Sequence, residues 1–327
     1  MRDHVSFLTT IPLFAGIPAQ ELEELGHVMG AIELSPDEVL FRQGEEADGL
    51  HLLQRGQIRV TMKLPGKSEH EVATLGVGEA LGEIPLIDGG LRMGTARALE
   101  PTRALFLSRA DFTALVSRLH PTAFTIKRRI LALACERLRR THAELVVMLG
   151  GGIAEESALR EEESARASSW DAFAQGRLPD PAYVLRLPFF RGYGEGELAE
   201  LLKSSLLVSV PAGLPILHEG FASEACTITL NGAIEEVIRR RDQAVRLRLC
   251  GPGRAFGYLG LIDGLHSSVS IATRERSVLL VVPVARFEKL FHGDTIDSYA
   301  FFHGIERDLM HALRLAQAPH ARLEAVR

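Results

Sequence analysis

The sequence predicts a mainly β protein with flanking helices, built as two jelly-roll barrels of the double-stranded β-helix type and joined by a long helix and a linker. Three observations predict this class. The chain has 327 residues, enough for about two domains. The same series of motifs occurs twice along the chain. Each copy contains many short β-prone runs that glycines and prolines separate, as in sandwiches and barrels.

The repeat has a nearly constant offset. Ile11–Gly16 resembles Leu187–Gly192 at an offset of 176 residues. The same offset relates Gly44 to Gly220 and Gly56 to Gly232, whereas an offset of 175 relates Gly78, Gly82 and Asp88-Gly89 to Gly253, Gly257 and Asp263-Gly264. The second copy is therefore one residue shorter than the first over the stretch that matches Gly56 to Gly78. In that stretch 63–67 reads as a hairpin tip, where length changes are tolerated. The predicted domains are 1–150 and 182–327, with a linker at 151–181.

Each copy is predicted to run from a helix through strands to further helices. The first helix, 18–29, has Leu22, Leu25 and Val28 at helical spacing. Ser108 is expected to cap a helix whose first turn contains Asp111. Between these helices, the predicted strands of the first copy are 38–42, 49–53, 57–62, 71–75, 94–98 and 104–107.

A long helix is predicted over 121–149. Phe124, Leu131, Leu138 and Leu145 follow one another every seven residues, which is the spacing of a coiled-coil seam. Two interpretations stay open: a homodimer through this helix, or a stripe that packs on the chain's own barrel. The glycines at 150–152 are expected to end the helix. In the linker that follows, Trp170 and Phe173 are expected to dock on a domain.

Charge and composition exclude some classes. The 37 Lys+Arg and 42 Asp+Glu give a net charge of −5, which gives no global support for nucleic-acid binding. No apolar run approaches the ~20 residues that a membrane span needs. Three cysteines without CxxC spacing and an N-terminus without a secretory signal indicate a cytoplasmic protein without a disulfide framework.

The most informative segment is 80–96, ALGEIPLIDGGLRMGTA. This segment resembles the phosphate-binding cassette of cyclic nucleotide-binding domains, G-E-x-x-L-x-x-x-x-x-R-x-[AG]-[ST]-[AV]. The order of helices and barrel glycines around it is similar to that family across 8–149. The resemblance implies a cyclic nucleotide ligand, no further cofactor, and ligand-binding residues Gly82, Glu83, Ile84, Pro85, Arg92, Met93, Gly94 and Thr95. An unrelated Glu–Arg salt bridge in a jelly roll is the alternative.

These residue types suit a cyclic phosphate. Arg92 supplies a permanently charged, planar fork for the phosphate oxygens. The 84–88 stretch can form one helical turn whose N–H groups face an anion, and Gly82 permits close approach of the backbone. Glu83, an acceptor when ionised, can accept the hydrogen of a ribose 2′-OH and so distinguish ribose from deoxyribose.

The base preference is indicated less directly. Family members that select guanine commonly place a threonine directly after the cassette arginine, and here that residue is Met93. The resemblance therefore implies cAMP rather than cGMP. Thr141 in the long helix resembles a threonine with which catabolite-activator-like proteins contact adenine, either of its own or of a neighbouring subunit. A threonine that tunes helix packing is the equal alternative.

The second copy keeps the fold-forming pattern and loses the ligand chemistry. Tyr258 stands where Glu83 does, Ser267 where Arg92 does, and Ser268 follows. Without the arginine, a buried phosphate has no counter-charge, and its desolvation is costly. This degenerate cassette is therefore predicted not to bind a cyclic nucleotide conventionally. His266, beside the lost arginine, is a weak substitute at best, and 239–241 reads as an exposed basic hairpin tip.

No catalytic constellation emerges. Kinase, P-loop, HExxH and G-x-S-x-G motifs are absent, and no H-x-H pair supports a metal centre. After a final helix expected near 295–316, only 319–327 remain, which leaves no room for a DNA-reading module. The sequence thus predicts a non-catalytic intracellular receptor for cAMP that relays binding to an unknown partner protein. The alternatives are a nucleotide-independent scaffold and a receptor for another anion such as a cyclic dinucleotide.

Overall fold

The computed structural model describes residues 2–63, 69–148, 170, 173–240 and 243–326. The chain divides into two compact units, Met1–Leu131 and Ala132–Arg327. This division falls inside the long helix α5, Pro121–Met148, so the second half of α5 belongs to the second unit. The domain limits 1–150, 151–181 and 182–327 stay a prediction from the repeat.

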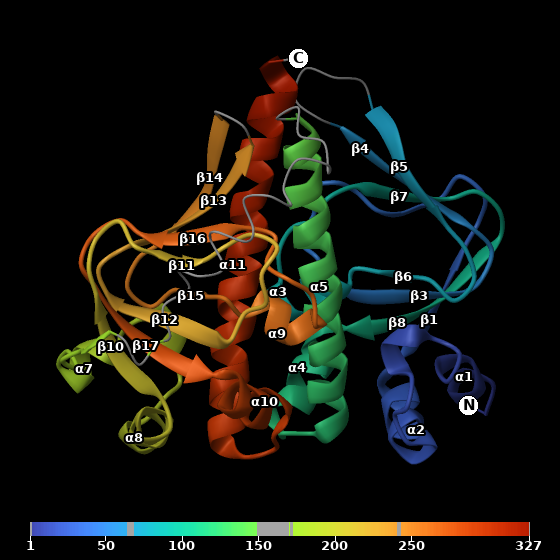
Figure 1. Cartoon of the computed structure of the whole chain (residues 1–327). Coiled ribbons are helices and arrows are strands. Elements are labelled where there is room, and N and C mark those ends of the chain that lie inside the picture. The colour runs from blue at the N-terminus through green and yellow to red at the C-terminus, as the bar shows by residue number, and fades with distance from the viewer. Residues whose placement is uncertain (1, 64–68, 149–169, 171–172, 241–242, 327) are drawn as a thin grey trace. The chain divides into compact units, whose positions relative to one another are not determined.

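The first unit is a two-sheet antiparallel barrel (Figure 1). One sheet has the order β1-β8-β3-β6 and the other the order β2-β7-β4-β5. The strands are β1 (Gly30–Leu34), β2 (Val39–Phe41), β3 (Gly49–Arg55), β4 (Ile58–Lys63), β5 (Glu69–Leu75), β6 (Ala80–Leu81), β7 (Thr95–Ala98) and β8 (Thr102–Ser108). All six predicted strands are confirmed. Strands β1 and β6 were not among the predicted strands.

Helices surround this barrel. They are α1 (Arg2–Leu8), the 3-10 turn η1 (Pro12–Phe14), α2 (Ala19–Val28), α3 (Glu83–Asp88), α4 (Arg109–Ser117) and α5. The predicted cap is confirmed, because the Ser108 hydroxyl accepts the N–H of Asp111 at 3.0 Å. Helix α1 was not predicted.

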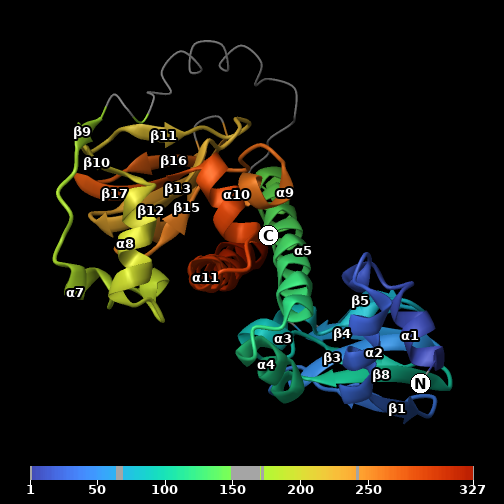
Figure 2. The same ribbon diagram turned by 90° about the horizontal axis from the view of Figure 1, so that it is seen from below.

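Strand β3 is buried on both of its faces, between which its side chains alternate. Leu50 and Leu52 point to one face and pack with residues of η1 and α2. Figure 2 shows the ribbon of α2 beside the strands of this barrel. Leu53 points to the other face and packs inside the barrel with Leu34 and Ile58. A strand that is covered on both faces carries apolar residues at successive positions, as 50–53 does apart from His51, because successive side chains point to opposite faces.

The second unit repeats this architecture strand for strand. Its sheets have the orders β15-β12-β17-β10-β9 and β11-β16-β13-β14, so only the short β9 is additional. The register repeats too: Val60 faces Ala73 in the first unit, and Glu236 faces Arg248 at the equivalent position. The elements are β9 (Ala174–Gln175), α7 (Pro181–Val184), η3 (Pro188–Phe190), α8 (Glu195–Lys203), β10 (Leu206–Val210), β11 (Pro215–Leu217), β12 (Ala225–Asn231), β13 (Ile234–Arg240), β14 (Gln243–Cys250), β15 (Ala255–Phe256), α9 (Leu259–Asp263), β16 (Ser270–Thr273), β17 (Ser277–Pro283), α10 (Val284–His292) and α11 (Ile296–Val326).

Helix α5 confirms the predicted long helix and contributes to two cores. Ile126 and Ile130 lie in the core of the first unit, and Leu145 lies in the core of the second barrel. Leu138 is 2% exposed and Leu145 is fully buried. Leu145 thus packs on the second barrel and not on the barrel of the first copy, which neither interpretation predicted, and a homodimer through α5 stays a prediction.

Two further expectations can be compared with the structure. The final helix does not end near residue 316, because α11 continues to Val326. A proline inside a helix removes one hydrogen bond, which can kink the helix without ending it. The helix accordingly continues past Pro319. Trp170 and Phe173 pack against the core of the second barrel, as predicted.

Some predictions fall outside the described residues. They concern most of the 151–181 linker, the glycines at 150–152, the hairpin tip at 64–67 and Arg241. The strands on either side of both hairpin tips do pair, β4 with β5 and β13 with β14. Within the described part of the chain, no helix has the length and apolar character that crossing a membrane requires.

Candidate functional site

The first cassette begins at a position that only glycine can occupy without strain. Gly82 follows β6, has φ +92 and precedes α3. A Cβ at Gly82 would lie 2.3 Å from Nη1 of Arg92 and 2.7 Å from the carbonyl oxygen of Gly49. The left-handed backbone and the lack of space both require glycine here. The loop thus lets the guanidinium of Arg92 approach the backbone closely.

Arg92 is the central side chain of this cassette. It is 3% exposed. Its Nη2 donates to Oδ1 of Asp48 at 2.6 Å and to the carbonyl oxygen of Gly49 at 3.0 Å. Its guanidinium carbon lies 4.0 Å from the centroid of the Phe41 ring, a cation–π contact. Asp48, Gly49 and Phe41 therefore fix the plane of the fork.

Two nitrogens of Arg92, Nε and Nη1, are buried and have no hydrogen-bond partner among the residues that the structure describes. A buried donor without a partner destabilises a fold by about 1–3 kcal/mol, and more when it is charged. Such a group in a glycine-lined loop is explained by an anion that accepts its hydrogen bonds. The residues present therefore fit a phosphate.

His51 on β3 is a neighbour of this fork that the sequence analysis missed. Its ring stacks on Phe106, with centroids 4.8 Å apart. Burial first, and then the positive charge of Arg92, lower the pKa of His51 to about 4. The ring is therefore neutral near pH 7 and adds no second cation beside Arg92. Asp48 and Phe41 were also missed, because their contacts with Arg92 join residues more than 40 positions apart.

The other predicted residues surround this loop. Glu83, Ile84 and Pro85 form the first turn of α3 and are half-buried, and Met93 is 40% exposed. A Cβ at Gly94 would lie 2.6 Å from the carbonyl oxygen of Thr61, so the close approach of β4 requires this glycine.

Two threonines were predicted as ligand residues. Oγ1 of Thr95 accepts the N–H of Gln43 at 3.1 Å. Thr141 belongs to the second unit, where its hydroxyl donates to the carbonyl oxygen of Arg137 at 3.2 Å. Its contact with a base stays a prediction.

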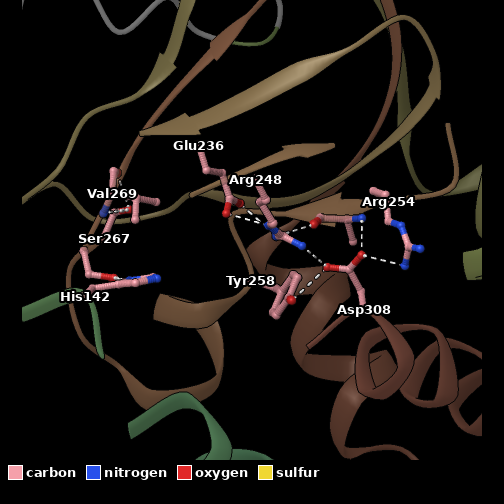
Figure 3. Close-up of polar contacts among 10 residues, drawn as sticks. His142, Glu236, Arg248, Arg254, Tyr258, Ser267, Val269 and Asp308 are labelled. Atoms are coloured by element: carbon pink, nitrogen blue, oxygen red, sulfur yellow. Dashed lines mark hydrogen bonds and ion pairs between the residues drawn. The ribbon is translucent and has the colours of Figure 1, made fainter. Parts of the chain in front are cut away.

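The second cassette keeps the geometry of the loop without the fork. Gly257 has φ +76 and Gly264 has φ +72, as their counterparts Gly82 and Gly89 also have positive φ. The Ser267 hydroxyl, which replaces the arginine, donates to the carbonyl oxygen of Val269 at 2.8 Å (Figure 3). Tyr258 is fully buried, and its hydroxyl donates to Asp308 of α11 at 2.9 Å.

The second half of α5 contacts this degenerate cassette within the second unit. Nε and Nη2 of Arg139 donate to the carboxylate of Asp263 at 2.5 and 2.9 Å, and Nη1 donates to the carbonyl oxygen of His266 at 2.6 Å. Nδ1 of His142 lies 2.8 Å from Oγ of Ser268. Burial, followed by the charges of Arg248 and Arg139, lowers the pKa of His142 to about 3, so this ring is neutral.

Comparison with protein families decides the classification. The model of the cyclic nucleotide-binding domain matches residues 31–118 and 207–294, together more than half of the chain. The chain belongs to this family. It contains two cyclic nucleotide-binding domains in tandem, and each match covers one of the two barrels.

Three known proteins illustrate the similarity. A cyclic AMP receptor protein from Thermus thermophilus is 34% identical over 134 residues, which are 41% of this chain and 60% of that protein. A cGMP-dependent protein kinase from Caenorhabditis briggsae is 28% identical over 117 residues, 35% of this chain and 16% of that protein. The regulatory domain of Toxoplasma gondii PKA with cAMP is 15% identical, with 88% of this chain and 90% of that chain covered and a TM-score of 0.33.

The chain thus spans 60% or less of the length of these two sequence relatives. Within the part of the chain that the structure describes, no three His, Cys, Asp or Glu side chains are grouped to hold a metal ion. The two domains differ where ligand chemistry is concentrated: the first cyclic nucleotide-binding domain has a buried arginine with two unpartnered nitrogens, and the second has Ser267 at that position.

Proposed function

We propose that the first domain is a receptor for a cyclic mononucleotide, with cAMP preferred over cGMP, and that the chain is a non-catalytic cytoplasmic protein that passes the binding signal to a partner protein. One observation carries the proposal: Arg92 is buried, oriented by Asp48 and Gly49, and has two nitrogens without a partner in the described part of the chain. Those nitrogens suit the oxygens of a cyclic phosphate.

The remaining ligand contacts follow from the cassette. Glu83 stands at the start of α3, directly after the glycine that touches Arg92. In this role its carboxylate accepts the hydrogen of the ribose 2′-OH while Arg92 holds the phosphate. Met93, 40% exposed, offers neither a hydroxyl to the phosphate nor a hydrogen bond to a guanine edge, which supports the preference for cAMP.

The signal would leave the cassette through packed helices of the first unit. A Cβ at Gly89, which ends α3, would lie 2.1 Å from the guanidinium of Arg109 in α4. Ile84 and Ile87 of α3 pack on the same core as Ile126 of α5. An inward shift of α3 toward bound phosphate would therefore displace α4 and the start of α5. This transmission requires that the ligand bind one arrangement of these helices better than the other.

Calorimetric titration of the purified chain with cAMP and cGMP tests the proposal. We expect saturable binding of one cAMP per chain, with weaker binding of cGMP, and loss of binding in Arg92→Ala. Arg103→Ala, which removes an exposed arginine of β8, is the matched control and should bind as the wild type does. Absence of binding at millimolar nucleotide, or unchanged binding in Arg92→Ala, would overturn the proposal and favour the scaffold alternative.

A further inference from the structure

The second domain contains a buried ionic cluster next to its degenerate cassette. We call it the Asp308 cluster. It comprises Glu236 of β13, Arg248 of β14, Tyr258 at the start of α9 and Asp308 of α11 (Figure 3). Each of the four residues is at most 5% exposed, which places two carboxylates, a guanidinium and a phenol out of contact with water. Buried charges are rare unless they are paired, so this cluster requires an explanation.

Asp308 is held as an anion would be held in a binding site. Its Oδ2 accepts from Nη1 of Arg248 at 2.7 Å and from the Tyr258 hydroxyl at 2.9 Å. Its Oδ1 accepts the N–H of Ala255 at 3.2 Å and lies 3.9 Å from Nη1 of Arg254. Both carboxylate oxygens thus have donors from the barrel, although Asp308 itself belongs to α11.

Arg248 is fully paired, in contrast to Arg92. Its Nε and Nη2 donate to the two carboxylate oxygens of Glu236 at 2.5 and 2.8 Å, and Nη2 also donates to the carbonyl oxygen of Ala255 at 2.8 Å. Burial lowers the pKa of Arg248, but the charges of Asp308 and Glu236 outweigh burial, and its pKa lies well above the usual value. Burial and then Asp308 raise the pKa of Tyr258, so the phenol stays protonated and donates.

The repeat shows that this cluster is particular to the second domain. Glu236 and Arg248 face each other where Val60 and Ala73 do in the first domain. Tyr258 stands at the position of Glu83, and Asp308 at the position of Leu133. The second domain therefore has a cation and carboxylates at positions where the first domain has apolar residues, beside the cassette that lacks the phosphate-binding arginine.

We propose that Asp308 is a built-in anionic ligand of the second domain: its carboxylate occupies an anion site formed by Arg248, Tyr258 and the N–H of Ala255, and thereby holds α11 against the barrel without any nucleotide. The site has the chemistry of a small-carboxylate site that the chain fills itself. Withdrawing Asp308 leaves Arg248 buried beside Glu236 with Nη1 unpaired, which disfavours any movement of α11 away from β14.

Hydrogen exchange of the full chain tests this inference, whether or not the first domain binds a nucleotide. Asp308→Ala removes the carboxylate and leaves space for formate. We expect amides of α11 in 302–313 to exchange at least about tenfold faster in this variant, because removal of one partner from a buried pair is strongly destabilising. Sodium formate should restore protection in a saturable manner, and sodium chloride at equal ionic strength should not. Asp294→Ala, which removes an exposed carboxylate just before α11, is the control.

Two outcomes would overturn the inference: wild-type exchange of α11 in Asp308→Ala, or equal effects of formate and chloride on it. If Asp308→Ala does not fold, Tyr258→Phe gives a graded measurement, because it removes only the 2.9 Å hydrogen bond to Asp308. We then expect exchange of α11 to be faster than in the wild type. Unchanged exchange in Tyr258→Phe would overturn the inference as well.

Discussion

Arg92 and Asp48 form an ion pair in which one partner is buried and the other is not. Nη2 of Arg92 lies 2.6 Å from Oδ1 of Asp48, while the exposed fractions of their side chains are 2% and 67%. The pair thus joins the bottom of the first cassette to the surface of the barrel. Because Nε and Nη1 of Arg92 stay unpartnered, Asp48 orients the fork without saturating it.

Asp48→Asn should weaken cAMP binding by about tenfold, less than Arg92→Ala does. The reason is that a charge-assisted hydrogen bond that fixes the guanidinium contributes about 1–2 kcal/mol more than its neutral counterpart. Calorimetry provides the measurement, with Glu23→Gln, an exposed carboxylate of α2, as control. Tighter binding in Asp48→Asn would show instead that Asp48 competes with the phosphate.

Glu83→Ala should weaken cAMP binding less than Arg92→Ala does. Loss of Glu83 removes an acceptor for a hydroxyl, whereas loss of Arg92 leaves a charged phosphate without a counter-ion. The same titrations with 2′-deoxy-cAMP separate the two roles. The deoxy analogue should bind the wild type about tenfold or more weakly, and this difference should vanish in Glu83→Ala. Persistence of the difference in Glu83→Ala would contradict the assigned role.

Restoring the cassette residues in the second domain should not create a second site. The double variant Tyr258→Glu/Ser267→Arg places a carboxylate near Asp308 and removes the Tyr258 hydrogen bond, so like charges become neighbours in a buried cluster. We expect one binding event in calorimetry, as in the wild type, together with a lower midpoint of urea unfolding. A second saturable event would refute this expectation.

Stability should fall as the pH is lowered from about 6.5 to 4, and His51 should contribute to this fall. The pKa of His51 is lowered to about 4 from 6.5, so the unfolded chain binds a proton in this range that the folded chain does not. Stability is present above pH 6.5 and decreases through the window, by up to about 3 kcal/mol for this residue. His51→Phe keeps the stacking on Phe106 and should reduce the pH dependence in urea titrations. An unchanged dependence would show that His51 titrates normally.

Arg139→Ala should destabilise the second unit. The side chains of Arg139 and Asp263 are 14% and 13% exposed, and their two hydrogen bonds are shielded from solvent. We expect a loss of about 2–4 kcal/mol in urea unfolding and faster hydrogen exchange in 263–268. Arg140→Ala is the matched control: the Arg140 side chain is 69% exposed and pairs with the equally exposed Glu136, so its loss should cost less than about 0.5 kcal/mol. Equal effects of the two variants would contradict the role of Arg139.

Local chemistry made much of this protein predictable. The glycines that defined the repeat, such as Gly82 and Gly257, adopt positive φ, a conformation that other residues rarely accept. Ser108 capped α4 as expected, because a cap depends on residues three positions apart. The loss of the fork in the second domain was equally visible, since it required only the alignment of Arg92 with Ser267.

Contacts between distant residues were decided by the tertiary structure. The sequence by itself determined two barrels, the cassette and the arginine within it, because spacing and residue type carry those features. Only the tertiary structure placed Asp48, Phe41 and His51 around Arg92, and only it joined Arg248 to Asp308 over 60 positions. The physical reason is that the free energy of a buried charged group depends on its burial and on the groups that pair with it. Strand register and helix packing decide which groups those are.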